Sequence, residues 1–128
     1  MAEICKQCVA EVSNKVGRLA EVTDKIKDAG VNICAICAWV EGDRGKLLLV
    51  AEDPEKACQC LSEVCEKCEW SEVVCVKVAN EPGALNVIAH KLADAKIGIN
   101  MVQATAGHGP EAVVLLDTTD NAKAAEIL

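Results

Sequence analysis

Residues 12–33 read VSNKVGRLAEVTDKIKDAGVNI, and residues 78–99 read VANEPGALNVIAHKLADAKIGI. The second stretch repeats the first at a constant offset of 66 residues, with 8 identities in 22 ungapped positions. The identical pairs are Val12/Val78, Asn14/Asn80, Gly17/Gly83, Leu19/Leu85, Lys25/Lys91, Asp28/Asp94, Ala29/Ala95 and Ile33/Ile99. A repeat of this period is long enough for a whole small domain, so the chain is interpreted as a tandem duplication.

Each copy contains the same order of expected elements: a strand, a helix, two strands and a helix. Apolar residues recur at i, i+3, i+7 and i+10 in the first helix of each copy, which is the spacing of one helical face. The expected strands cover residues 7–12, 31–40, 46–51, 73–78, 97–105 and about 112–117. Asp53 and Asp120 each precede a second helix in a capping position. This order predicts an α+β fold of ferredoxin-like βαββαβ repeats in tandem, with an antiparallel sheet and helices on one face.

We expect two domains, at residues 1–70 and 71–128. The chain stops at Leu128, inside the last helix of the second copy, so the second domain is expected to lack a last strand of its own. Two explanations stay open at this point. Residues 70–78 could serve both as the last strand of the first copy and as the first strand of the second, or a strand from another chain could complete the sheet.

The composition argues against several classes of function. The chain is 52% hydrophobic and 26% charged, which is typical of a globular protein, and its net charge of −7 argues against nucleic acid as a partner. The N-terminus lacks a basic start followed by an apolar run, and no apolar stretch approaches about 18 residues. Motifs of hydrolases, nucleotide-binding loops and zinc proteases are absent from the sequence. We therefore expect a cytoplasmic protein that is not an enzyme, has no cofactor and contacts neither membrane nor nucleic acid.

The repeated pattern resembles the ACT domain. In the first copy, residues 14–19 fit N-x-(P or V)-G-x-L and residues 29–33 read A-G-V-N-I; residues 80–85 and 97–100 are their counterparts in the second copy. The resemblance is to small stand-alone proteins that carry two ACT domains and no catalytic domain. It implies βαββαβ units and a regulatory role, in which a free amino acid or a similar small molecule binds between paired domains and an enzyme is regulated.

The resemblance also implies which residues contact the ligand: the loop after the first strand and the start of the second strand of each copy. In the first copy these residues are Asn14, Lys15, Gly17, Leu19, Val31, Asn32 and Ile33. In the second copy they are Asn80, Glu81, Gly83, Leu85, Ile99 and Asn100. Two positions depart from the pattern, because Val16 replaces the usual proline and Lys96 stands where the first copy has Gly30.

The residue types at these positions suit an amino-acid ligand. A glycine lets backbone approach a ligand closely at a helix N-terminus, where free N–H groups favour a carboxylate. The side chain of Asn14 or Asn80 can accept a hydrogen bond from an ammonium group, and Glu81 can supply a negative charge. The structural alternative is that both asparagines only shape a turn and help to cap a helix.

Nine cysteines favour a second interpretation, a cysteine-based metal-binding or redox protein on the same scaffold. The C-x-x-C pairs Cys5/Cys8 and Cys34/Cys37 lie in expected strands, where residues three apart point to opposite faces and cannot chelate one metal. From Pro54 to about Glu69 we expect a single amphipathic helix whose cysteines act as small hydrophobic residues. No metal is expected; if one binds, the candidate ligands are Cys58, Cys60, Cys65 and Cys68.

Residues 32–38 and 46–50 are apolar on both alternating faces of their expected strands. One face of the sheet packs against the helices, so the other presents an apolar surface, which indicates a partner. We therefore expect a homo-oligomer that forms through sheet faces or edges. His90 and His108 are expected at the solvated surface.

Overall fold

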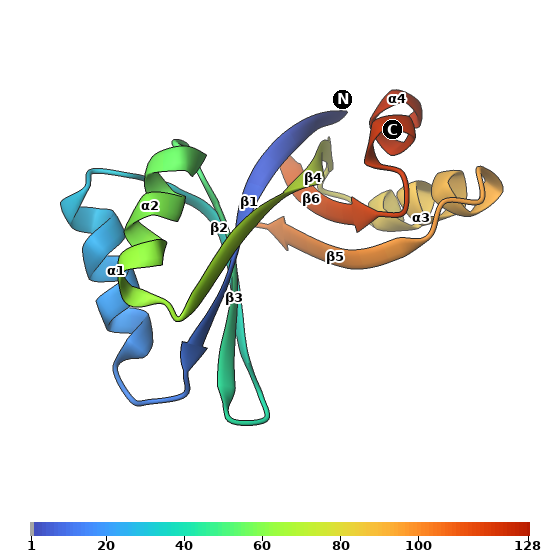
Figure 1. Ribbon diagram of the computed structural model, residues 1–128. Helices are drawn as coiled ribbons and strands as arrows, with labels where there is room; N and C mark the ends of the chain where they lie inside the picture. Colours follow the sequence, from blue (N-terminus) through green and yellow to red (C-terminus); the bar gives the residue numbers. More distant parts are fainter. Residues whose placement is uncertain (1) are drawn as a thin grey trace. The chain divides into compact units, whose positions relative to one another are not determined.

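The computed structural model describes residues 2–128 (Figure 1). Its strands are β1 (Ala2–Ser13), β2 (Ile33–Glu41), β3 (Arg44–Ala51), β4 (Lys67–Ala79), β5 (Ile99–Ala106) and β6 (Glu111–Thr118). Its helices are α1 (Arg18–Asp28), α2 (Pro54–Val64), α3 (Ala84–Asp94) and α4 (Asn121–Ile127). The chain divides into an N-terminal unit, residues 6–71, and a C-terminal unit, residues 2–5 with 72–128. Residue 1, part of the first expected domain, lies outside the described residues.

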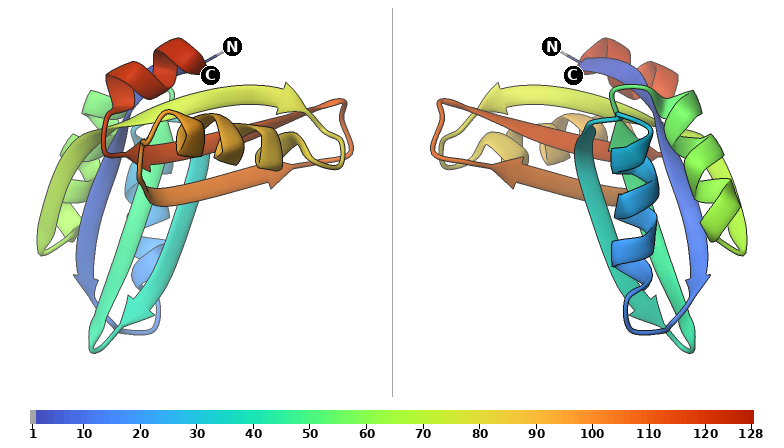
Figure 2. Two further views of the ribbon diagram at one scale, coloured as in Figure 1. Left: turned by 90° about the vertical axis from the view of Figure 1, so that its right-hand side faces the viewer. Right: turned by 90° about the vertical axis from the view of Figure 1, so that its left-hand side faces the viewer.

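In the N-terminal unit, the strands follow the order β2-β3-β1-β4. β3 pairs antiparallel with both neighbours, so that Leu47 lies opposite Ala10 of β1 and opposite Ala38 of β2. Helices α1 and α2 lie side by side on one face of these strands (Figure 2). Between the two layers is a core of nine buried residues: Cys8, Ala10, Val22, Ile26, Leu47, Leu49, Ala51, Ala57 and Leu61.

The C-terminal unit repeats this order as β5-β6-β4-β1, with its own antiparallel pairs β4·β6 and β5·β6. Strand β4 is continuous from Lys67 to Ala79, so it ends the N-terminal unit and begins the C-terminal unit. Residues 2–5 of β1 supply the fourth strand of the C-terminal unit. The second copy is therefore completed by the same chain. Its core consists of Val74, Val76, Ile88, Leu92, Ile97, Val114, Leu116 and Ala124.

The predicted α+β fold of ferredoxin-like repeats is confirmed, and so are its helix caps. Lys56 N–H donates to the Asp53 carboxylate over 3.1 Å, and Lys123 N–H donates to the Asp120 carboxylate over 3.0 Å. None of the helices within residues 2–128 has the length and apolar character needed to cross a membrane.

The helix predicted from Pro54 to about Glu69 is wrong at its C-terminal end. α2 stops at Val64, and Cys65 is already extended, with φ −102° and ψ 145°. The backbone N–H of Glu66 donates to the carbonyl oxygen of Glu11 over 3.0 Å, which turns the chain away from the helix and into β4. This long-range contact overrides the local helical pattern, so Cys65 and Cys68 do not continue the helical stripe of α2.

Candidate functional site

A cavity of about 280 Å³ lies in the N-terminal unit where β1 runs into α1. Its walls come from the end of β1, the loop that follows, the first turns of α1 and the facing parts of β2 and β3. Four of the residues predicted from the sequence line it together: Asn14, Lys15, Gly17 and Leu19. The structure therefore gathers one half of the predicted first-copy site around a single cavity.

The glycine of this loop has a conformational reason to be there. Gly17 precedes the first residue of α1 with φ 93°, and Gly83 precedes α3 with φ 90°. Such left-handed backbone is open to glycine and strained for other residues, which explains why both copies keep it. Among residues 2–128, no side chain caps either helix. The backbone N–H of Arg18, the first residue of α1, donates to the carbonyl oxygen of Lys15 over 3.3 Å, within the loop that borders the cavity.

Asn14 and Lys15 hold polar groups that the fold does not use. The backbone N–H of Asn14 donates to the carbonyl oxygen of Asp43 over 3.3 Å, which closes the loop against the β2–β3 turn. Within residues 2–128, the side-chain amide of Asn14 makes no hydrogen bond and the ammonium group of Lys15 has no carboxylate partner. Both groups are exposed, and both are available to a ligand.

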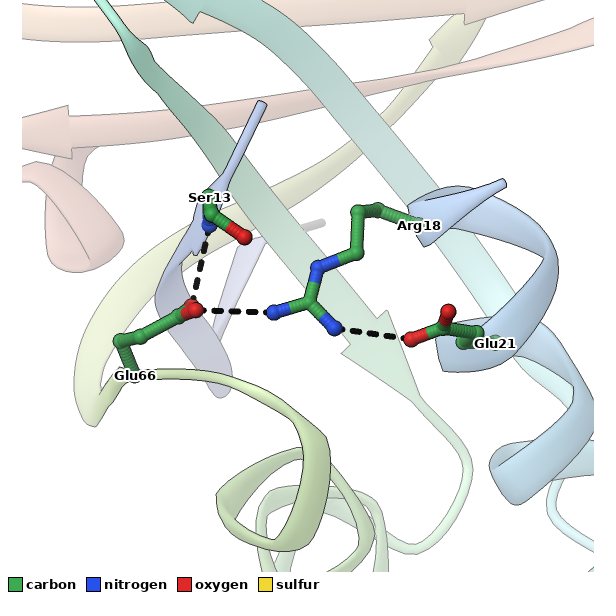
Figure 3. A network of polar contacts seen from close by, with 4 residues as sticks. All are labelled: Ser13, Arg18, Glu21 and Glu66. Atoms are coloured by element: carbon green, nitrogen blue, oxygen red, sulfur yellow. Dashed lines mark hydrogen bonds and ion pairs between the residues drawn. The ribbon is translucent and has the colours of Figure 1, made fainter. Parts of the chain in front are cut away.

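Arg18 is a third polar residue of the cavity, and a network of carboxylates holds it in place (Figure 3). Its Nη1 lies 2.8 Å from Oε2 of Glu21, and its Nη2 lies 2.8 Å from Oε1 of Glu66. The other oxygen of Glu66 accepts a hydrogen bond from the backbone N–H of Ser13 over 3.0 Å. The buried Nε–H of Arg18 has no acceptor among the described residues. The network joins β1, α1 and the segment between α2 and β4.

These contacts keep the network ionised near neutral pH. The hydrogen bond to Glu21 raises the pKa of the Arg18 guanidinium. Desolvation alone would raise the pKa of Glu66, but hydrogen bonds from its own backbone N–H and from Ser13, together with the nearby Arg18, outweigh it and lower the pKa. Arg18 was not predicted from the sequence. A comparison of charges at the offset of 66 could have singled it out, because Lys15 and Arg18 correspond to Glu81 and Ala84.

The other half of the predicted first-copy site lies elsewhere. Val31, Asn32 and Ile33 line a separate cavity of about 520 Å³ beside the C-terminal half of α1. The side-chain amide of Asn32 donates to Oε1 of Glu52 over 3.2 Å. Within the N-terminal unit, the length of α1 therefore separates the two halves, and the structure does not bring them into one site.

In the second copy, Asn80 has a structural partner. Its side-chain amide donates to the carbonyl oxygens of Gly107 and Gly109, over 3.1 and 3.0 Å, and so holds the turn between β5 and β6. The remaining predicted residues of this copy, Glu81, Gly83, Leu85, Ile99 and Asn100, are exposed. Asn80 thus performs the turn-shaping role that the sequence left open as the structural alternative.

Strand pairing identifies the counterparts of the cavity residues across the two units. Val12 pairs with Gly45 in the N-terminal unit, and Val78 pairs with Ala112 in the C-terminal unit. Lys46, which lines the cavity one residue after Gly45, therefore corresponds to Val113. The three cations of the cavity, Lys15, Arg18 and Lys46, are replaced by Glu81, Ala84 and Val113.

The cysteines form a covalent link that the sequence did not reveal. Cys8 of β1 and Cys58 of α2 are joined by a disulfide, with their Cα atoms 5.8 Å apart. The half-buried Cys60, Cys65 and Cys68 pack against the same core. Burial raises the pKa of the Cys65 thiol to about 11 and also raises that of Cys68.

The positions of these cysteines bear on the metal alternative. The disulfide commits Cys58, one of the four candidate ligands, to a bond with Cys8. Across residues 2–128, no group of three or more His, Cys, Asp or Glu side chains is arranged to hold a metal ion. A spacing in the sequence could not show that Cys8 and Cys58 meet, because the pair brings together two elements 50 residues apart.

Three comparisons place this geometry among known proteins. The family model for the ACT domain pair matches residues 4–128. The structure of protein BT0572 from Bacteroides thetaiotaomicron is similar, with a TM-score of 0.89 and 29% identity over 99% of this chain and 88% of that chain. No curated protein matches this chain.

Regulatory subunits of aspartate kinase have a similar fold. For the ligand-free subunit from Thermus thermophilus, the TM-score is 0.69 and the identity is 14%, covering 98% of this chain and 93% of that one. For the subunit from Thermus flavus, the TM-score is 0.66 and the identity is 15%, covering 99% of this chain and 90% of that one. The duplicated βαββαβ units, the glycine that opens the first helix of each copy and the family match agree with one another. The chain belongs to the family of ACT domain pairs.

Proposed function

We propose that this chain is a non-catalytic regulatory module, which binds a small carboxylate-bearing ligand in the cavity of its N-terminal unit. The observation that carries the proposal is the cavity at the β1–α1 junction, where Asn14 and Lys15 are uncommitted. A free amino acid or a similar molecule is the ligand class that membership of the family implies. Aspartate kinase subunits with the same fold are described as regulatory, and the proposal extends that role to this chain.

The polar and apolar sides of the cavity suit such a ligand. A carboxylate would lie against Lys15 and the N-terminal turn of α1, where the positive charge of the lysine and the positive end of the helix dipole favour an anion. An apolar side chain would pack against Leu19 and Val40, which are both exposed. A ligand that orders this loop also acts on Arg18, and through Glu66 on the segment after α2.

A thermal unfolding screen against the twenty amino acids and a set of small organic acids tests this function. A ligand at about 100 times its Kd should stabilise the protein by roughly 2.7 kcal/mol, which is readily seen as a rise in Tm. The variant Asn14→Ala should lose the shift. Asn86→Ala, at an exposed position of α3, is the matched control and should keep it. A flat response to every compound would reject the proposal.

We further propose that copies of the chain associate through β2, the outer strand of the N-terminal unit. Trp39 and Val40 of this strand are 43% and 56% exposed, and such apolar side chains favour a partner surface. Light scattering over a hundredfold range of protein concentration tests the association. Val40→Glu should shift the equilibrium toward monomer, and a concentration-independent monomer would exclude self-association.

The redox alternative has one specific observation in its favour, the Cys8–Cys58 disulfide. Thiol counting by alkylation and mass spectrometry, in glutathione buffers of graded redox potential, measures where this bond breaks. A midpoint within the range of the glutathione couple would support a redox role. A bond that stays intact throughout would leave it a structural cross-link.

A further inference from the structure

We infer that the N-terminal cavity selects apolar monocarboxylic acids without an ammonium group over the corresponding amino acids. The inference rests on the proposed function and narrows its ligand class. Its starting point is the charge of the lining: among the residues that surround the cavity, three are cations and none is an aspartate or a glutamate. The cations are Lys15, Arg18 and Lys46.

Three carboxylates near the cavity already have partners. Glu21 and Glu66 hold the guanidinium of Arg18, and Glu11 forms an ion pair with Lys46. All three carboxylates belong to residues outside the lining. Among the three lining cations, Lys15 is the one without a carboxylate partner in residues 2–128. A ligand carboxylate gains an ion pair with it.

An ammonium group on the ligand would enter an unfavourable environment. It would lie near the ammonium group of Lys15, which carries the same charge and has no carboxylate partner, and the lining itself contains no carboxylate to pair with it. Asn14 could accept one hydrogen bond through its amide oxygen, but its NH₂ group serves a carboxylate equally well. A neutral amide therefore does not reverse the preference that the charges set.

The rest of the lining defines the body of the ligand. Val12, Leu19, Val22, Trp39, Val40 and Leu47 form an apolar wall around a volume of about 280 Å³. This volume lies just below the range that is typical of ligand cavities, about 300–1,000 Å³, and so favours a small ligand. A short branched or cyclic hydrocarbon body with one carboxylate fits both the wall and the cations.

The second copy supplies an internal contrast for the same positions. There Lys15, Arg18 and Lys46 are replaced by Glu81, Ala84 and Val113, so the cationic character is confined to the first copy. The backbone features that the two copies share, such as the glycine before each helix, do not require these cations. The loop backbone that both copies share therefore forms without these cations.

The test compares three ligands of nearly equal shape by isothermal titration calorimetry: 4-methylpentanoate, L-leucine and 4-methyl-1-pentanol. We expect 4-methylpentanoate to bind at least tenfold more tightly than either of the other two. In Lys15→Glu, which introduces the residue type of the second copy, its affinity should fall at least tenfold. Lys56→Glu, an exposed position of α2 with the same change in net charge, should leave the affinity within twofold. Lys15→Ala should show an intermediate loss, and circular dichroism establishes that each variant is folded.

The outcomes separate this inference from the proposed function. If L-leucine, or another amino acid of the screen, binds more tightly than its deaminated analogue, the ligand class is wrong and the regulatory module stands. Equal losses in Lys15→Glu and Lys56→Glu would overturn the role of Lys15 as the selecting charge. If neither acids nor amino acids bind to the wild-type protein, both the inference and the proposed function fail.

Discussion

In the N-terminal repeat, Asn14 has an uncommitted amide beside a cavity, whereas Asn80 in the C-terminal repeat uses the same amide to hold the β5–β6 turn. The two asparagines occupy equivalent positions, before glycines with nearly equal φ angles of 93° and 90°. The backbone of the loop is therefore the same in both copies, and its side chains differ in use. An identical residue therefore has different uses in the two repeats: it holds a turn in one copy and leaves its side-chain amide unused in the other.

The cores of the two units also differ at equivalent positions. Cys8 and Cys58 of the N-terminal unit correspond to Val74 and Ala125 of the C-terminal unit, so apolar packing replaces a covalent bond. Ala57 and Ala124, which precede Cys58 and Ala125, are both fully buried, and this supports the equivalence of the two helices. The second unit shows that this packing position can be filled without a disulfide.

The largest effect on stability is expected from breaking the disulfide between Cys8 and Cys58, a position that apolar packing fills in the C-terminal unit. Reduction, or the substitution Cys58→Ser, is expected to lower the free energy of unfolding by about 2–4 kcal/mol, because the cross-link no longer restricts the unfolded chain. Denaturant unfolding with and without dithiothreitol measures the effect. Reduction should add nothing further to Cys58→Ser.

The control for this experiment is Cys37→Ser, at an exposed position of β2. It should change the stability by no more than about 0.5 kcal/mol. If reduction destabilises Cys58→Ser as much as it destabilises the wild type, another pair of cysteines carries the bond.

Much of the fold could be predicted from the sequence because its signals are local and occur twice. The helical faces, the capping aspartates and the glycines depend on neighbours along the chain. Asn14 through Leu19 could likewise be assigned to one site, because a single turn holds them together. The network around Arg18 could not, since Glu66 is 48 residues away and reaches it only when α2 ends at Val64. Lys46 could not be assigned to the site either, because its position beside the loop depends on the register of β3 against β1.

Substituting Asn14 and Asn80 tests directly whether the two repeats use their equivalent asparagines differently. Asn80→Ala removes two hydrogen bonds to turn carbonyls and should cost about 1–2 kcal/mol of stability. Asn14→Ala removes no hydrogen bond within the described residues, so its cost should stay below about 0.5 kcal/mol. Chemical denaturation of both variants measures the difference. Equal costs would contradict the distinct roles of the two residues.

A smaller effect is expected where the copies differ in backbone strain. Lys96 has φ 59°, whereas its counterpart Gly30 has φ 73°. A lysine in the left-handed region is strained, so Lys96→Gly should stabilise the protein by up to about 1 kcal/mol. The greater flexibility of glycine in the unfolded state reduces this gain. Gly30→Lys should destabilise it by a similar amount. If Lys96→Gly and Gly30→Lys both stabilise or both destabilise the protein, side-chain packing rather than the backbone φ angle determines the stability effect at these two positions.

The smallest effect concerns the pH dependence of the Arg18 network, which has no equivalent around Ala84. The folded structure lowers the pKa of Glu66, so its ionised form contributes stability that is fully present above the unfolded pKa of about 4.3 and is lost as the pH falls through the folded value. The difference in stability between wild type and Glu66→Gln should therefore shrink on acidification from neutral pH to about pH 3. Glu63→Gln, which removes an exposed ion pair with Lys25, serves as the control for a general charge effect. A difference that stays constant with pH would mean that Glu66 acts through its shape and hydrogen bonds, and that its charge contributes nothing to holding Arg18.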